Sequence, residues 1–190
     1  MLPIFQQEGK KGDLLRASLE LFAARGYDAV SVRDIAKEAG VSEAALYKHF
    51  SSKQELAVHI FTAIITDYTE RLRLIEAAPA GAVERLCRIV DATYDLYRDY
   101  PAPIRFALLS QYYFWLEVAE ELKPHFVIRR IIEAGMAAGE IPRRDVYFLI
   151  TVFSGLMLQP LAQYPYFKDV LPEFSRLKDE VRAMVRKMFA

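Results

Sequence analysis

With 190 residues, of which 53% are hydrophobic, the chain has room for one large or two small domains around a substantial core. Its 25 Lys and Arg residues are balanced by 25 Asp and Glu residues, which excludes a uniformly basic clamp for nucleic acid. A single cysteine, Cys87, excludes an intramolecular disulfide, and its apolar neighbours predict a buried core thiol. The first residues, MLPIFQQEGKK, lack the pattern of a secretion signal, so we expect a cytoplasmic protein.

The first fifty residues predict three short helices. The first is expected to be capped by Asp13 and to end at Gly26. Ser31 and Asp34 have the spacing of a capping box that opens a second helix, and Gly40 is placed to end it. The inward stripe of the second helix repeats at i, i+3, i+4 and i+7: Val32, Ile35, Ala36 and Ala39.

A third helix is predicted over residues 42–50, with Ser42 as its N-cap and with Leu46 and Phe50 facing inward. Its other side then carries small and hydrogen-bonding residues, namely Glu43, Ala44, Ala45, Tyr47, Lys48 and His49. Alanine allows close approach and contact with a thymine methyl, lysine reaches phosphate or guanine, and tyrosine donates to phosphate. The pattern predicts a helix-turn-helix for the major groove of DNA; the alternative is a plain helical-bundle fragment.

The remaining sequence also reads as helices. Ser52 and Glu55 form another capping box, so a long helix is expected from Lys53 to about Ala77. Further helices are expected over about 82–99, 124–138 and 172–189, besides an apolar segment over 146–167. Because no stretch alternates like a strand, we expect an all-α fold of about nine helices. The expected domains are a helix-turn-helix domain over 1–54 and a larger helical domain over 55–190, which contains the expected dimerisation helices.

The segment 146–167 contains no charged residue, and its length is nominally sufficient to span a membrane. Polar residues and prolines interrupt its second half, so we expect a buried helix and no membrane partner. Because its apolar residues surround the helix, we infer that one flank packs on its own subunit and another on a second copy. The alternative is that both flanks close the core of one subunit. The expected dimer interface comprises Phe148, Val152, Gly155, Gln159, Phe174, Leu177, Val181, Met184 and Met188.

The N-terminal stretch resembles the tetracycline-repressor (TetR) family of bacterial transcription regulators over roughly residues 12–58. The matching features include Gly26-Tyr27, Ile35-Ala36, Leu46-Tyr47, His49-Phe50 and Ser52-Lys53. The resemblance implies a homodimer on a palindromic DNA operator, with a small-molecule effector. The family often has Lys and Gly where this chain has Glu43 and Ala44, so an operator sequence does not carry over.

The DNA contacts are expected to be few and local, because residues 1–53 carry eight Lys and Arg against seven Asp and Glu. Lys10 and Lys11 precede the first expected helix and are candidates for an arm on the DNA backbone, or alternatively part of a disordered tail. The predicted DNA-binding residues are Lys11, Ser31, Val32, Arg33, Ser42, Glu43, Ala44, Ala45, Tyr47, Lys48, His49 and Lys53.

Aromatic residues are concentrated in the second domain. One interpretation is that they are ordinary core and interface residues. The other, which the resemblance favours, is that some line a cavity for an apolar or aromatic small molecule. The candidates for such a cavity are Phe61, Ile65, Tyr68, Tyr94, Phe106, Tyr113 and Phe153.

No catalytic residue, metal or cofactor is expected. The histidines His49, His59 and His125 are far apart and have no zinc-ligand spacing, and no phosphate-binding glycine loop or nucleophile motif is present. The predicted function is a homodimeric transcription regulator, most simply a repressor that a small hydrophobic ligand releases from a palindromic operator. The alternative is a ligand-independent DNA-binding scaffold or cell-division factor.

Overall fold

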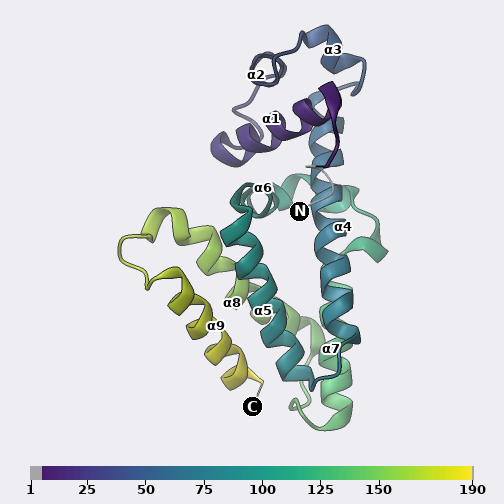
Figure 1. Ribbon diagram of the computed structural model, residues 1–190. Helices are drawn as coiled ribbons and strands as arrows, with labels where there is room; N and C mark the ends of the chain where they lie inside the picture. Colours follow the sequence, from purple (N-terminus) through teal and green to yellow (C-terminus); the bar gives the residue numbers. More distant parts are fainter. Residues whose placement is uncertain (1–5, 190) are drawn as a thin grey trace. The chain divides into compact units, whose positions relative to one another are not determined.

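The computed structural model describes residues 6–189, and every regular element in this range is a helix, which confirms the all-α prediction (Figure 1). The chain forms two compact units. Unit 1 comprises Met1–Asp67 and Tyr100–Leu122, and unit 2 comprises Tyr68–Asp99 and Lys123–Ala190. Residues 1–5, on which the expectation about a secretion signal depends in part, lie outside the described residues.

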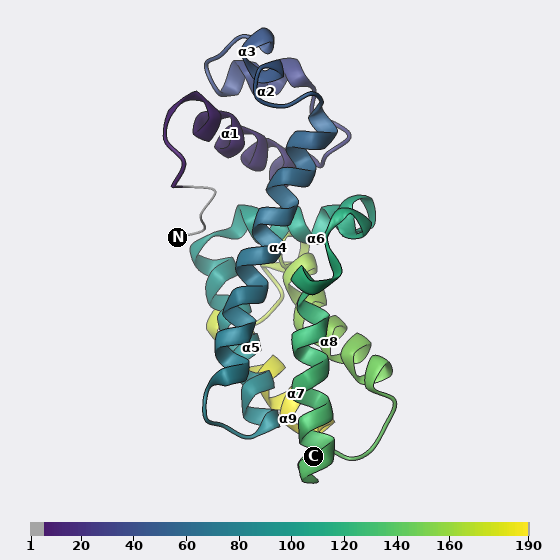
Figure 2. The same ribbon diagram turned by 90° about the vertical axis from the view of Figure 1, so that its right-hand side faces the viewer.

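Unit 1 contains the three short N-terminal helices and a helix from the middle of the sequence. The elements are α1 (Gly9–Arg25), α2 (Val32–Glu38), α3 (Glu43–Tyr47), the first part of α4 (Lys53–Ala77), α6 (Pro101–Phe114) and the 3₁₀ turns η2 (Trp115–Glu117) and η3 (Glu120–Leu122). Helix α6 packs against α1 and lies below it in Figure 2. The expected boundary at residue 54 therefore differs from the boundaries of the compact unit, which includes part of α4 and all of α6.

The start of α1 corrects the expected cap. The helix begins at Gly9, whose φ of 75° suits glycine, so Asp13 lies one turn inside and pairs with Arg16 instead of capping. The Nη1 atom of Arg16 donates to the carbonyl oxygen of Gln7 at 3.0 Å. Lys11 consequently belongs to the first turn of α1 and lies 5.6 Å from the ring centre of Phe50, so it is neither a free arm nor a tail.

Aromatic rings from α1, α4 and α6 form much of the unit 1 core. Phe22 of α1 and Phe106 of α6 stack with their ring centres 5.5 Å apart. Phe61 of α4 meets Phe106 edge-on at 6.2 Å and Phe114 at 5.8 Å. These offset and edge contacts suit the quadrupoles of aromatic rings and add to the hydrophobic burial. They explain why α6 is part of the same compact unit as α1.

Unit 2 is a helical bundle around α5. Its elements are the last part of α4, α5 (Ala82–Asp99), α7 (Pro124–Ala138), α8 (Val146–Phe167) and α9 (Phe174–Met188). Helix α5 contacts α7, α8 and α9. Cys87 is buried on α5, which confirms its prediction as a core thiol.

Helix α8 is long and apolar enough to cross a membrane by length and composition alone. Two prolines, Pro160 and Pro165, lie within it. One of its faces packs into the core of unit 2 through Leu149, Ile150, Phe153, Met157 and Leu161. This buried face is what the sequence predicts for a core helix.

Candidate nucleic-acid interface

The start of α2 and the turn between α2 and α3 are held by hydrogen bonds and a glycine that the sequence predicts. Ser31 and Asp34 form a reciprocal capping box, with the Asp34 amide donating to Ser31 Oγ at 3.1 Å and the Ser31 amide donating to Asp34 Oδ2 at 3.0 Å. The Ser31 hydrogen bonds lower the pKa of the Asp34 carboxyl. Gly40 has a φ of 65°, and the next amide, that of Val41, donates back to the Ala36 carbonyl at 2.9 Å.

Helix α3 is short and oriented by one buried side chain at its centre. Ser42 caps it by accepting from the Ala45 amide at 3.2 Å, and Leu46 is fully buried. The opposite side is open, with the ring of Tyr47 52% exposed. Glu43, Ala44, Lys48 and His49 are exposed as well, and Ala45 is half-buried. The predicted orientation of this side is thus confirmed, while its contact with DNA stays a prediction.

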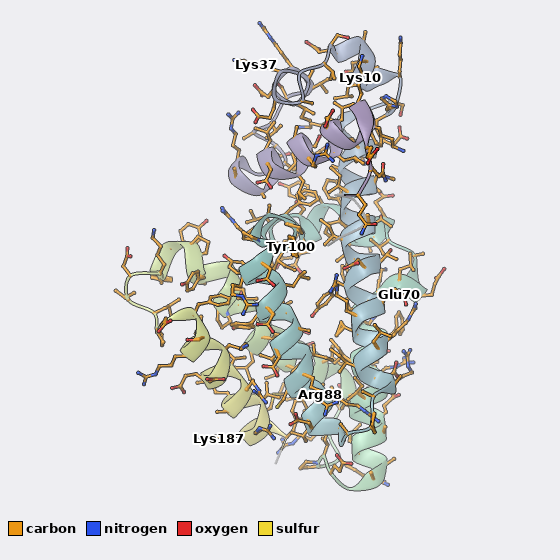
Figure 3. All side chains as sticks on the ribbon, viewed as in Figure 1. Lys10, Lys37, Glu70, Arg88, Tyr100 and Lys187 are labelled. Carbon is orange, nitrogen blue, oxygen red and sulfur yellow. The ribbon has the colours of Figure 1, made fainter. Side chains whose placement is uncertain are left out.

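The helix before this surface adds further exposed groups. Ser31 and Arg33 are exposed at the start of α2, and Val32 is half-buried. Lys37 points away from the ribbon of α2 (Figure 3). Sequence reasoning did not select Lys37, although it lies one turn after Arg33 on the same short helix. Together with Lys48, these groups give the α2–α3 surface three exposed cations.

Lys53 is used within unit 1 and is not turned toward the open surface. Its Nζ atom donates to the carbonyl oxygens of Tyr27 at 3.0 Å and Val30 at 2.9 Å. It also lies 4.2 Å from the ring centre of Tyr27. Its ammonium group ties the start of α4 to the loop between α1 and α2, and contact of Lys53 with a DNA phosphate stays a prediction.

The same loop is held from α6 by Tyr113. The Tyr113 hydroxyl donates to Asp28 Oδ2 at 2.6 Å, and this hydrogen bond and the carboxylate charge raise the pKa of Tyr113. The Tyr27 ring lies 5.8 Å from the Tyr113 ring. Sequence reasoning missed Asp28, because no local pattern links it to a residue 85 positions away. Tyr113, a candidate for the ligand cavity, thus supports the N-terminal loop.

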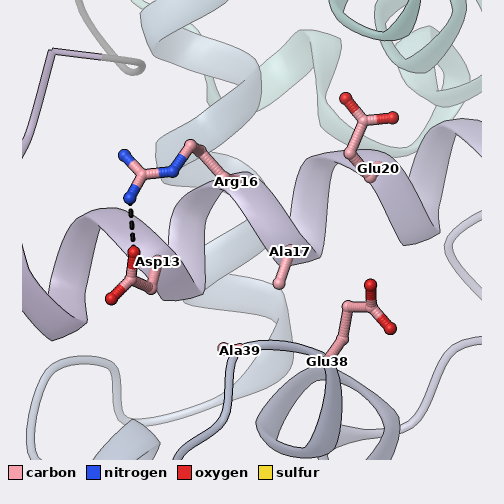
Figure 4. A pocket seen from close by; sticks show the side chains of 6 residues that line it. All are labelled: Asp13, Arg16, Ala17, Glu20, Glu38 and Ala39. Atoms are coloured by element: carbon pink, nitrogen blue, oxygen red, sulfur yellow. Dashed lines mark hydrogen bonds and ion pairs between the residues drawn. The ribbon is translucent and has the colours of Figure 1, made fainter.

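A shallow hollow of about 320 Å³ lies between α1 and α2 (Figure 4). Three carboxylates line it, and its only cation, Arg16, is paired with Asp13. Such a site repels phosphate. Its lining residues are Asp13, Arg16, Ala17, Glu20, Glu38 and Ala39.

The residues predicted to line an effector cavity are divided between the two units. In unit 1, Phe61, Ile65 and Phe106 are core residues, packed against neighbouring side chains. In unit 2, Tyr94 and Phe153 are fully buried, and the Tyr68 hydroxyl lies 2.8 Å from Thr93 Oγ1. The structure therefore does not bring the predicted set together within one unit.

The expected dimer residues fall into two groups. On α8 and α9, Phe148, Val152, Gly155, Gln159 and Met184 are exposed, with Phe148 58% accessible. The others face their own unit: Leu177 and Val181 are buried on α9, which packs against α5, and Met188 is half-buried. Phe174 stacks on Tyr97 with ring centres 5.7 Å apart. The assignment of Leu177 and Val181 to a subunit interface is corrected for this reason.

Within residues 6–189, no group of three or more His, Cys, Asp and Glu side chains is arranged to hold a metal ion.

Comparison with known proteins places these features in a family. Residues 14–60 match the N-terminal domain model described as bacterial regulatory proteins, tetR family. The transcriptional repressor KstR2 of Mycobacterium tuberculosis is 32% identical over 99 residues, which are 52% of this chain and 50% of KstR2. The transcriptional activator FasR of Mycolicibacterium smegmatis is 31% identical over 117 residues, which are 62% of this chain and 53% of FasR. The chain thus spans about half the length of the curated relatives it matches.

The fold as a whole is also shared with a solved structure. The transcriptional regulator FadR of Bacillus subtilis, in a crystal structure with stearoyl-CoA, matches with a TM-score of 0.74 at 19% identity. The match covers 94% of this chain and 98% of the FadR chain. The proteins matched here carry the names of transcription regulators, not enzymes. Residues 14–60, which contain the helix-turn-helix, thus carry the N-terminal domain of the tetR family of bacterial regulatory proteins, and the chain shares its helical fold with FadR.

Proposed function

We propose that the chain is a homodimeric DNA-binding transcription regulator whose α3 enters the major groove, and that it is a repressor released from its operator by a small apolar ligand. The observation that carries the proposal is the orientation of α3. Its buried Leu46 and its Ser42 cap hold Ala44, Tyr47 and Lys48 toward solvent on a helix short enough to fit the groove. DNA binding implies a location in the bacterial cytoplasm.

Few phosphate contacts are needed to hold α3 in the groove. Arg33, Lys37 and Lys48 are exposed around it, and the Tyr47 hydroxyl is a further donor. Phosphate contacts set the position of a protein on DNA without reading sequence. With so few cations, affinity for random DNA should be modest and should decrease only moderately with salt.

The exposed apolar strip on α8 and α9 supports a dimer. Phe148, Val152 and Gly155 follow one another at turn spacing on α8, and Met184 is exposed on α9. Large exposed apolar side chains in a row favour a protein contact over solvent. A twofold axis through this strip would present two α3 helices to half-sites about 34–36 Å apart, which requires a palindromic operator.

Helix α4 is the natural connection between ligand and DNA. It runs without a break from Lys53 to Ala77, so its beginning belongs to unit 1 and its end to unit 2. A ligand that prefers one orientation of this helix would change how the two α3 helices are presented. Allosteric coupling of about 1–3 kcal/mol would weaken operator binding roughly 5- to 150-fold.

In the FadR structure with stearoyl-CoA the apolar part of the ligand is a long acyl chain, so ligands with such a chain, supplied as acyl-CoA, are the first class to test. Gel-shift titrations on an operator obtained by selection from random DNA would test the proposal. We expect a specific complex that acyl-CoA dissociates while free CoA does not. A complex that no member of a panel of acyl-CoA and aromatic ligands dissociates would count against ligand-controlled repression. A regulator of this kind can also activate transcription when it binds DNA, and FasR is named as an activator.

One observation favours the ligand-independent scaffold as a second candidate. Phe61, Phe106, Tyr94 and Phe153, all predicted to line a cavity, have no exposed surface. If these aromatic residues only fill the cores, they leave no cavity for a ligand among them. A ligand-independent scaffold does not require such a cavity. Genome-wide mapping of bound DNA separates the two candidates: a scaffold occupies many dispersed sites, whereas a ligand-controlled repressor occupies a few promoters.

A further inference from the structure

The most unusual group on the DNA-facing side of α3 is the carboxylate of Glu43. It is exposed on the first residue of the helix and forms no ion pair or hydrogen bond with any other described residue. Tyr47 lies one turn further on the same side, and Ala44 and Lys48 form the neighbouring column. The carboxylate is therefore free to meet whatever α3 faces.

A carboxylate in this position is poorly suited to the DNA backbone, because phosphate repels it. In the major groove it is attracted only by the exocyclic amino groups of bases. Cytosine offers its N4 amino group with no acceptor on the same edge. Adenine offers N6 beside the acceptor N7, while guanine and thymine present acceptors that repel a carboxylate.

The backbone around Glu43 is fixed on both sides. The direction in which the Glu43 side chain leaves α3 is therefore set before DNA binds. The Val41 amide bonds back to the Ala36 carbonyl at 2.9 Å, and Ser42 Oγ caps the helix at 3.2 Å. Leu46, three residues later, is fully buried in the unit 1 core. A side chain on such a framework is suited to reading a base at one position of a half-site.

We propose that Glu43 determines operator specificity by accepting a hydrogen bond from cytosine N4, and so requires a C·G pair at one fixed position in each half-site. This inference rests on the proposed DNA-binding function. The small side chain of Ala44 leaves room for the neighbouring base pair and favours a thymine methyl there. At this position we expect Glu43 to select cytosine and to reject guanine and thymine.

The test is selection of bound duplexes from a random pool by the full-length wild-type protein and two variants. Glu43→Gln replaces the carboxylate with an amide, which pairs with adenine N6 and N7. Glu38→Gln removes the same charge from an exposed residue of α2 that lines the hollow, and is the matched control. We expect the fixed cytosine for wild type and for Glu38→Gln, and a shift toward adenine for Glu43→Gln.

A competition measurement then gives the size of the effect. On the selected palindrome, changing the C·G pair to T·A in both halves should weaken wild-type binding about tenfold per half-site. For Glu43→Gln the same change should cost less than threefold, and thermal unfolding should match wild type.

The outcomes separate this inference from the proposed function. A palindrome whose cytosine persists in Glu43→Gln, or disappears equally in Glu38→Gln, would overturn the inference alone. Failure of a folded wild-type protein to enrich any sequence would overturn the proposed function and the inference with it.

Discussion

The Lys53 ammonium group shows how much a single residue contributes to unit 1. It donates two charged hydrogen bonds, to Tyr27 and Val30, in a partly buried place. Because Lys53→Met leaves both carbonyls without this donor, we expect the free energy of unfolding to fall by about 2 kcal/mol. Urea unfolding followed by circular dichroism measures this change. Lys48→Met, at an exposed lysine, is the control and should change stability by less than about 0.5 kcal/mol.

A second residue, Tyr68, should make stability depend on alkaline pH. Burial of its hydroxyl raises the pKa of Tyr68 to about 12, from the ordinary value of 10.0. The native state therefore keeps the proton after the unfolded chain has lost it, so its stabilising contribution is full below pH 10 and is lost as pH rises to about 12. The loss is on the order of 2 kcal/mol.

Tyr68→Phe should remove this part of the pH dependence. The measurement is urea unfolding of wild type and variant between pH 9 and 12, with the difference in unfolding free energy plotted against pH. Tyr112→Phe, at a tyrosine that is 92% exposed, serves as the control and should follow the wild-type curve. Parallel curves for wild type and Tyr68→Phe would show that this hydroxyl is accessible to solvent.

Residue roles that depend on short-range spacing were predictable, and those that depend on distant partners were not. The Ser31–Asp34 box and the burial of Leu46 follow from residues three or four positions apart. Lys53 and Tyr113 pair with residues 23 to 85 positions away, and no local pattern specifies these pairs. Asp13 does not cap α1, because the helix begins at Gly9, one turn before the position that the sequence predicts.

At the scale of helices, α9 is attached to α5 by three ion pairs along its length. Glu84 pairs with Arg186 at 2.7 Å, Asp91 with Arg182 at 3.4 Å and Asp95 with Lys178 at 3.1 Å. The middle pair is the least exposed of the three. Desolvation raises the pKa of the Asp91 carboxyl, against the lowering effect of Arg182. Because this pair is the least exposed, solvent screens the attraction between Asp91 and Arg182 least, and their coupling energy should be the largest of the three.

A double-mutant cycle on Asp91→Asn and Arg182→Met should give a coupling energy of about 1 kcal/mol. The exposed pair between Arg176 and Glu180, at 3.7 Å on α9 itself, is the control and should give less than about 0.5 kcal/mol. Urea unfolding of the single and double variants measures both cycles. Equal coupling in the two cycles would mean that solvent screens the α5–α9 pair as fully as a surface pair.

The helices themselves were predictable, but their partners were not. Apolar periodicity and capping residues predict helices over ranges close to those of α4, α5, α7 and α9. The packing of α6 on α1 was not predicted, because apolar stripes show which side of a helix is buried and not what covers it. For the same reason Phe106 was assigned to a ligand cavity, whereas it stacks on Phe22 in the unit 1 core.

At the scale of the whole molecule, the proposed function needs two copies, since one five-residue recognition helix offers little surface for specific binding. The strip that would join them contains Phe148, which is 58% exposed on α8. Phe148→Glu would place a carboxylate in an apolar contact at the twofold axis, where burial of an unpaired charge is costly. We expect a monomer that remains folded, by circular dichroism, and binds the palindrome at least 100-fold more weakly than the wild-type dimer. Light scattering after size exclusion gives the oligomeric state, and gel shifts on one and two half-sites give the binding.

Tyr112→Glu is the control, because it adds the same charge at an exposed aromatic residue of unit 1. This variant should remain dimeric and bind the palindrome as wild type does. A dimeric Phe148→Glu protein would place the subunit contact elsewhere, and a monomer with undiminished affinity for the palindrome would show that one copy suffices for DNA binding.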